Sequence, residues 1–218
     1  MNNKNNATEL VFILDRSGSM AGLEEDTIGG FNAMLDKQKK QDGEAFVTTV
    51  LFDHEISTLH DRVKLSDLKP LTDRDYTVRG CTALLDAIGQ TVQHIKTVHR
   101  YVRPEDVPEK TVFVITTDGL ENASKEYSTA AVKKLIEQQK ECGWEFLFLG
   151  ANIDAVQTAA SFGIAPDRAA NFHADRKGTK TVYKAVAEAV CGFRAGKCVP
   201  REWSEDIDAD FASRGSER

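Results

Sequence analysis

The chain has 218 residues, of which 41% are hydrophobic and 28% are charged, which is typical of one soluble globular domain. Its net charge of −6 argues against a general nucleic-acid-binding protein, which would carry a basic surface. No apolar run approaches the ~20 residues that span a membrane. The polar N-terminus also lacks the apolar core of a secretory signal. We therefore expect a cytoplasmic protein with no membrane-spanning segment, whose four cysteines remain free thiols.

The spacing of apolar residues predicts strands that alternate with helices along most of the chain. Such alternation indicates an α/β fold with a mostly parallel sheet and helices on both faces. Residues 1–8 are expected to be disordered. Expected strands are 9–15, 45–52, 56–60, 111–116, 144–149 and 169–173, the third being an antiparallel edge strand after a turn at 53–55. Expected helices are 23–40, 82–99, 127–142, 154–162 and 179–193.

Two further features stand out among these elements. Gly29 and Gly30 lie inside the first helix, where each glycine costs about 1 kcal/mol relative to alanine. Close packing against a neighbour or a hinge would explain them, and we favour packing. The polar stretch 61–81 is a long irregular loop, and loops of this length are usually functional or disordered. Here the loop has to carry Thr82 across the molecule.

The most informative stretch is an Asp-Arg-Ser-Gly-Ser-Met motif that directly follows the apolar run 10–14. That run is short, continuous and rich in branched residues, which is typical of a parallel strand buried on both faces. Asp15 therefore ends a central strand. Ser17 and Ser19 follow at alternate positions, and Gly18 between them allows a tight turn. One carboxylate and two hydroxyls at this place suit a hard cation such as Mg²⁺.

Two distant stretches carry further oxygen-bearing side chains. Thr82 lies in the stretch 80–87, and Asp118 follows a predicted buried strand in the stretch 116–122. An Asp-x-Ser-x-Ser loop, then a Thr, then an Asp-Gly, in this order, resembles the von Willebrand factor A (vWA) domain, the family of the integrin inserted domain. The resemblance covers roughly the first 195 residues and suggests a stand-alone bacterial or phage-type member. It implies a metal-ion-dependent adhesion site formed by Asp15, Ser17, Ser19, Thr82 and Asp118.

The same resemblance implies a three-layer, doubly wound sheet with the strand order 3-2-1-4-5-6 and an antiparallel third strand. In that order the switch point lies between strands one and four, and sheets of this kind bind ligands at the carboxyl ends of the strands near that point. Asp15 and Asp118 end these two strands. The motif and the implied topology therefore indicate one place.

The expected function is a non-enzymatic protein-interaction module. Two carboxylates roughly neutralise a divalent cation, for which Mg²⁺ is expected and Mn²⁺ or Ca²⁺ are alternatives. The resemblance implies that an Asp or Glu carboxylate of a partner protein completes the metal shell. Four residues are candidates for orienting the metal ligands without binding the metal themselves: Asp53, Asp86, Glu121 and Asn122. The partner and the oligomeric state are not specified by the sequence.

Other interpretations stay open at this point. Each predicted ligand could instead cap a helix or a turn. A Mg²⁺-dependent hydrolase, such as a phosphatase, or a structural subunit stabilised by its metal are alternative functions. A haloacid-dehalogenase-like phosphatase would need a second Asp where the chain has Ser17, and the glycine-rich nucleotide-binding motifs are missing. No histidine can be placed at the site from sequence; the five are His54, His60, His94, His99 and His173.

The C-terminal stretch differs in composition from the rest. We expect the vWA-like domain to comprise residues 9–196 and to be followed by an acidic tail, 197–218. This tail places Trp203, Ile207 and Phe211 among acidic residues. A solvated tail is the first expectation, and an acidic-aromatic docking segment is the alternative.

Overall fold

The computed structural model describes residues 6–215, and within that range the predicted strands and helices are confirmed. The strands are β1 (Thr8–Asp15), β2 (Ala45–Phe52), β3 (Ile56–Lys64), β4 (Lys110–Thr117), β5 (Glu145–Ala151) and β6 (Ala169–Phe172). The helices are α1 (Glu24–Lys39), α2 (Leu84–Tyr101), α3 (Thr129–Glu141), α4 (Ala155–Ser161), α5 (Arg176–Arg194) and α6 (Glu205–Arg214).

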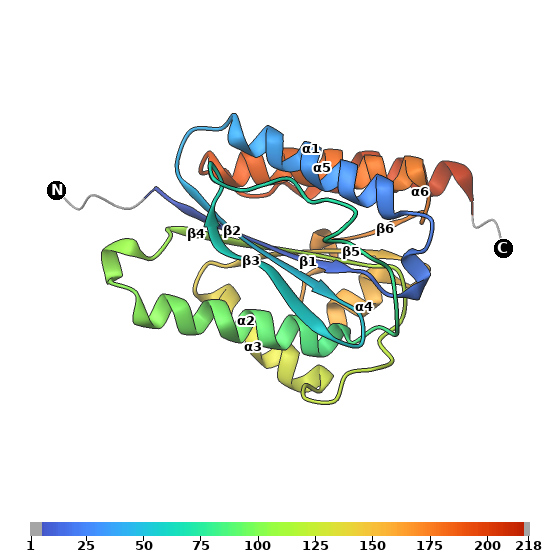
Figure 1. Cartoon of the computed structure of the whole chain (residues 1–218), viewed down its shortest axis with the longest axis horizontal. Coiled ribbons are helices and arrows are strands. Elements are labelled where there is room, and N and C mark those ends of the chain that lie inside the picture. The colour runs from blue at the N-terminus through green and yellow to red at the C-terminus, as the bar shows by residue number, and fades with distance from the viewer. Residues whose placement is uncertain (1–5, 216–218) are drawn as a thin grey trace.

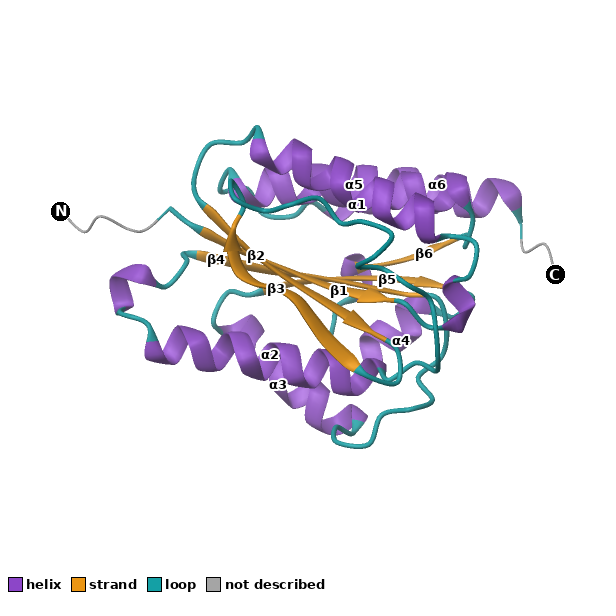
Figure 2. Ribbon diagram, viewed as in Figure 1, coloured by secondary structure: helices purple, strands orange, loops and turns teal. Residues whose placement is uncertain are grey.

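The strands form one sheet in the order β3-β2-β1-β4-β5-β6, in which only β3 runs antiparallel to its neighbour. Helices α1, α5 and α6 cover one face, and α2, α3 and α4 cover the other (Figure 1). The ribbon coloured by secondary structure shows the same three layers (Figure 2). The predicted order and the antiparallel third strand are thus confirmed. No helix within residues 6–215 is both long enough and apolar enough to span a membrane.

Strand β1 lies in the middle of the sheet because its side chains are apolar on both faces. Leu10, Phe12 and Leu14 point into the core beneath α1 and α5. Val11 and Ile13 point into the core beneath α2 and α3. All five side chains are buried, as expected for a parallel strand covered on both sides. This double burial fixes the register that brings the end of β1 beside the end of β4.

Strand β3 is longer than predicted and irregular. It continues to Lys64, and its pairing with β2 shifts register between Val47 and Val50. Arg62 has a positive φ of 49°, an uncommon conformation for a residue other than glycine. Residues 61–64 read as loop because they do not alternate regularly between polar and apolar, and only a sheet edge tolerates such a strand.

The two glycines of α1 differ in their surroundings. A Cβ added to Gly30 would lie 2.3 Å from the ring of Tyr183 on α5, whereas nothing lies within 4 Å of a Cβ added to Gly29. The expected close packing is therefore found at Gly30 alone. It lets α1 and α5 approach each other above the sheet.

The stretch after β3 crosses the molecule as a long loop that is held by its own apolar side chains. Leu68, Leu71 and Tyr76 are buried. Asn32 on α1 pairs with the backbone of Leu71 in both directions, donating to its carbonyl at 2.9 Å and accepting from its N–H at 2.8 Å. This anchoring fixes the path by which the loop approaches the carboxyl ends of the strands.

The expectation of a solvated C-terminal tail is wrong for residues 201–214. The segment Arg201–Ser204 forms a 3-10 helix, and α6 follows it directly. Trp203 is only 7% exposed, its Nε1–H donates to the carbonyl of Asp167 at 2.9 Å, and Ile207 is also buried. These two apolar residues offset the charge of the segment, so that it packs on α5 and β6.

The expected disorder of residues 1–8 is wrong for Ala7 and Thr8. Residues 1–5 and 216–218 lie outside the described part. Ala7 is buried, and Thr8 already begins β1.

Candidate metal centre

Asp15 is held at the end of β1 by hydrogen bonds to both of its carboxylate oxygens. Oδ1 accepts from the N–H of Ser17 at 2.7 Å. Oδ2 accepts from the hydroxyl of Thr117 at 2.8 Å and from the N–H of Asp118 at 3.2 Å. The carboxylate is also buried. Its hydrogen bonds to Thr117 and Asp118 tie it to the end of β4. Thr117 was not singled out from sequence, although its place one residue before Asp118 marks the end of the same strand.

The two serines of the loop after β1 lie next to each other. Their hydroxyl oxygens are 3.1 Å apart, and Ser17 is buried while Ser19 is exposed. Ser17 occupies the N-cap position of the short 3-10 helix Gly18–Met20, yet its side chain makes no capping hydrogen bond. The capping alternative is therefore not supported for Ser17, whose hydroxyl contacts that of Ser19 instead.

Thr82 reaches the same place from the long loop. Its N–H donates to the Oδ1 of Asn122 at 2.9 Å, and its carbonyl accepts from the N–H of Asn122 at 3.0 Å. A Cβ added to Gly119 would lie 3.5 Å from the hydroxyl oxygen of Ser19 and 3.7 Å from that of Thr82. Three segments distant in sequence therefore converge beside Gly119. Thr82 does not cap α2, because the N-cap residue there is Ala83.

Asp118 is buried and only half satisfied. Its Oδ1 accepts a hydrogen bond from the side-chain amide of Asn152, at the end of β5. Its Oδ2 is buried without a hydrogen-bond partner among the described residues. Burial raises the pKa of Asp118 from 3.8 to about 6; the hydrogen bond from Asn152 opposes this shift, and the charge of Asp15 adds to it.

Asn152 is a residue of the site that sequence reasoning missed. It has a positive φ of 55°, a conformation that asparagine tolerates better than most residues. It follows directly after β5, whose carboxyl end lies beside that of β4. A lone asparagine after a strand is a weak signal, so only the fold identifies it.

The arrangement suits a hard divalent cation. The donors are all oxygens, two from carboxylates and three from hydroxyls, which is the chemistry that Mg²⁺ prefers. The Oδ2 of Asp118 is buried and has no partner within residues 6–215, which fits a bound group from outside them, because buried polar atoms normally have a partner. The structure therefore brings the five predicted residues to one edge of the sheet, and their role as metal ligands remains a prediction.

Of the residues expected behind the ligands, Asn122 is the one that contacts a predicted ligand directly, through its hydrogen bonds with Thr82. Asp86 on α2 instead accepts from the N–H groups of residues 125–127. Glu121 accepts from the N–H groups of Leu85, Ala123 and Ser124. Both carboxylates thus order the loop after Asp118.

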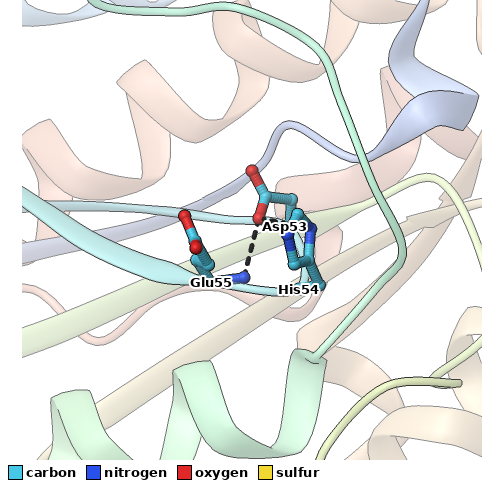
Figure 3. A group of neighbouring side chains, drawn as sticks. All are labelled: Asp53, His54 and Glu55. Atoms are coloured by element: carbon cyan, nitrogen blue, oxygen red, sulfur yellow. Dashed lines mark hydrogen bonds and ion pairs between the residues drawn. The ribbon is translucent and has the colours of Figure 1, made fainter.

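A second cluster of charged side chains occupies the turn between β2 and β3 (Figure 3). Asp53, His54 and Glu55 place potential ligand atoms within 4.8 Å of one another. However, Oδ2 of Asp53 lies 2.9 Å from the Nε atoms of both Arg16 and Arg79, and Glu55 pairs with Arg79 at 2.6 Å. Because arginines already neutralise both carboxylates, this cluster is a charge network rather than a second cation site.

The five histidines have partners other than the two serines of the site. His60 pairs with Thr49, His94 with Asp61, and His99 with Glu9. The remaining two bond to Asp53 and to the carbonyl of Phe211. Among the described residues, then, the hydroxyls of Ser17 and Ser19 have no histidine partner.

Comparison with solved structures finds the same fold in several vWA domains. Proximal thread matrix protein 1 from the mussel byssus, with zinc in its MIDAS motif, is 14% identical with a TM-score of 0.57 over 84% of this chain and 46% of that chain. This chain therefore spans about half the length of the mussel protein. The vWF domain of the type V pili tip protein Mfa5 from Porphyromonas gingivalis is 12% identical, with a TM-score of 0.61 over 84% of this chain and 94% of that chain. Manganese-loaded TRAP from Plasmodium vivax is 18% identical, with a TM-score of 0.55 over 81% and 71%.

Sequence comparison identifies the family of the chain. None of the curated proteins matches the chain in sequence. The family model described as "VWA domain containing CoxE-like protein" matches residues 2–152, well over half of the chain and all five residues of the candidate metal centre. The chain thus belongs to the family of CoxE-like proteins that contain a vWA domain.

Proposed function

We propose that the chain is a non-enzymatic protein-interaction module that binds a divalent cation, Mg²⁺ by preference, through the five predicted residues. The proposal rests chiefly on one observation, the buried Oδ2 of Asp118 that has no partner in residues 6–215. This oxygen belongs to the residue next to Gly119, around which the hydroxyls of Ser19 and Thr82 converge. A cation there would give the carboxylate the partner it lacks.

The five predicted residues would supply two kinds of ligand to the cation. Asp15 and Asp118 supply negative charge that roughly neutralises the cation, while the hydroxyls of Ser17, Ser19 and Thr82 supply neutral oxygens. A bound Mg²⁺ keeps water wherever the protein provides no ligand. An Asp or Glu carboxylate of a partner protein is a hard, anionic oxygen donor that can replace such a water. We therefore propose acidic side chains as the feature by which partners are recognised.

Two solved relatives support the binding of a divalent cation. The mussel protein holds zinc at its MIDAS motif, and the Plasmodium protein is loaded with manganese. A hydrolase with a serine nucleophile is less favoured, because within residues 6–215 the two serine hydroxyls contact each other and no histidine bonds to either.

The first test is a Mg²⁺ titration followed by thermal unfolding. A ligand bound only to the folded state stabilises it by RT ln(1 + [L]/Kd), about 2.7 kcal/mol at a hundredfold excess over Kd. Wild type should gain stability and Asp15→Ala should not. Asp154→Asn is a matched control, because Asp154 caps α4 from the adjacent strand end and asparagine caps equally well. If neither wild type nor control gains stability with Mg²⁺, Mn²⁺ or Ca²⁺, the cation site is wrong.

The second test concerns the partner's carboxylate. A random-peptide library is selected on the immobilised protein in Mg²⁺ and in EDTA. Enrichment of peptides that contain Asp or Glu in Mg²⁺ alone is the expected result. Enrichment of the same peptides in EDTA, or on Asp15→Ala, would contradict recognition through the metal.

A further inference from the structure

Two of the loops that form the candidate metal centre are bonded to each other. One loop carries Ser17 and Ser19, and the other carries Thr82. Backbone hydrogen bonds join them: the N–H of Gly18 donates to the carbonyl of Gly80 at 3.1 Å, and the N–H of Arg79 donates to the carbonyl of Arg16 at 2.9 Å. The two loops therefore run side by side at the carboxyl edge of the sheet.

The turn between β2 and β3 contacts the loop that carries Thr82. The N–H of Ala83 donates to the carbonyl of Asp53 at 2.8 Å. Gly80 has a φ of +70°, and a Cβ added there would lie 2.1 Å from the ring of His54. The long loop thus passes the turn so closely that only glycine fits at this position.

The side chain of Asp53 links the three segments. It is fully buried, and its Oδ1 accepts from the N–H of Glu55 at 2.7 Å (Figure 3). Its Oδ2 lies 2.9 Å from Nε of Arg16, which is nearly buried, and accepts from Nε of Arg79, which is half exposed, at the same distance. One carboxylate oxygen is therefore shared by the first residue after Asp15 and by a residue three positions before Thr82.

This network keeps Asp53 charged. Burial alone would raise its pKa, but the hydrogen bonds from Glu55 and Arg79, together with the charges of both arginines, hold the pKa below its usual value. Removing a carboxylate of this kind leaves a buried guanidinium without its counter-charge, which is strongly unfavourable. Arg16 would then have to move, and Arg16 adjoins both Asp15 and Ser17.

We propose that Asp53 is a positioning residue for the cation site, which holds the serine loop and the Thr82 loop at the separation the cation requires. This inference rests on the proposed function. It assigns no direct contact with the cation to Asp53, because its Oδ1 accepts from the N–H of Glu55 and its Oδ2 is engaged by two arginines.

The test compares two buried carboxylates that differ in their distance from the site. Glu9 is also fully buried and pairs with Arg62 at 2.8 Å. However, it lies near the start of β1, at the end of the strands opposite to the candidate metal centre. Asp53→Asn and Glu9→Gln each remove one buried charge with little change of shape. Mg²⁺ affinity is measured by calorimetry at a temperature where circular dichroism shows each variant to be folded.

Both variants should unfold at lower temperature than wild type, because each leaves an arginine unpaired. Asp53→Asn should weaken Mg²⁺ binding by roughly 10- to 100-fold, the range seen when residues that orient metal ligands are removed. Glu9→Gln should bind Mg²⁺ as wild type does. Wild-type affinity in Asp53→Asn, or an equal loss in Glu9→Gln, would overturn the inference.

A second readout does not depend on the metal. Amide hydrogen exchange is followed at Gly18 and Arg79, whose N–H groups form the bonds between the two loops. Exchange at both should accelerate in Asp53→Asn and not in Glu9→Gln; unchanged exchange in Asp53→Asn would overturn the positioning role even if wild type binds no cation. A wild type without Mg²⁺ binding, but with faster exchange in Asp53→Asn, would refute the proposed function alone.

Discussion

The side-chain amide of Asn152 donates a hydrogen bond to Oδ1 of Asp118, while Oδ2 of the same carboxylate is buried and has no hydrogen-bond partner among residues 6–215. Of the two carboxylate oxygens of Asp118, Oδ2 is therefore the one left for the candidate metal centre. The pairing joins the ends of β4 and β5, which lie side by side in the sheet. We therefore expect Asn152 to orient the carboxylate of Asp118.

Replacing Asn152 with glycine tests this expectation. Glycine adopts the positive φ of this position without strain, so the variant removes the amide and leaves the backbone unchanged. We expect Mg²⁺ affinity to fall by about tenfold or more, because Asp118 can then rotate. Calorimetry measures the change, and equal affinities of variant and wild type would show that Asp118 is held by other contacts.

Replacing Asp118 with asparagine should separate stability from metal binding. In the cation-free protein the pKa of Asp118 is raised to about 6, so the folded state favours the neutral form of this side chain. The resulting contribution to stability is fully present at pH values below the ordinary aspartate pKa. That contribution is lost as the pH rises through about 6. Without cation at pH 8, Asp118→Asn should therefore melt at a higher temperature than wild type, yet gain nothing from Mg²⁺. A lower melting temperature of the variant without cation would contradict the costly burial of this charge.

The same pKa predicts how Mg²⁺ binding depends on pH in wild type. The cation must displace the proton from Asp118. Affinity should be nearly constant above the pKa of about 6 and should fall by about tenfold for each pH unit below it. Titrations between pH 5 and pH 8, at constant ionic strength, measure this profile. A flat profile across this range would show that Asp118 is not a ligand.

The neighbouring glycines of α1 should respond in opposite ways to alanine. Gly30→Ala places a Cβ 2.3 Å from the ring of Tyr183, and overpacking of this kind costs about 1–3 kcal/mol. Gly29→Ala meets nothing within 4 Å and should gain up to about 1 kcal/mol from helix propensity. Urea unfolding of both variants gives the two free-energy changes, and a stabilised Gly30→Ala would show that α1 and α5 can separate without cost.

The C-terminal segment should contribute to the stability of the domain. Trp203→Ala should lower the free energy of unfolding by about 3–5 kcal/mol, because it empties a buried site and removes the bond to Asp167. Phe211 on α6 is a matched control: it is 36% exposed and stacks on His173, so Phe211→Ala should cost only about 1 kcal/mol. Similar small losses for both variants would mean that the segment is not docked in solution.

The fold could be predicted from sequence where local pattern and burial agree. The apolar run before Asp15 specifies a strand covered on both faces, and the alternation of strands and helices specifies the layers. The strand order came from the resemblance to vWA domains, because nothing local in a sequence says which strands pair. Only the resemblance to vWA domains placed Thr82 beside Ser19, because more than sixty residues separate the two in the chain.

Other features escaped prediction for physical reasons. The acidic segment after residue 200 reads as solvated because its charge outweighs two apolar residues, but Trp203 and Ile207 contact a surface that only the folded domain provides. Asn152 and the link from Asp53 to Arg16 and Arg79 depend on neighbours that are distant in sequence. Composition and periodicity record what a segment prefers, whereas these interactions depend on what the rest of the chain places beside it.

The irregular β3 has a consequence for how the molecule meets other proteins. An edge strand exposes unpaired backbone groups that can template edge-to-edge pairing and aggregation. In β3 the register shifts and the positive φ of Arg62 interrupt that template, and Asp61, Arg62 and Lys64 add charge along it. A strand from another chain would have to match this interrupted backbone and bury these charges, so β3 blocks growth of the sheet from this side.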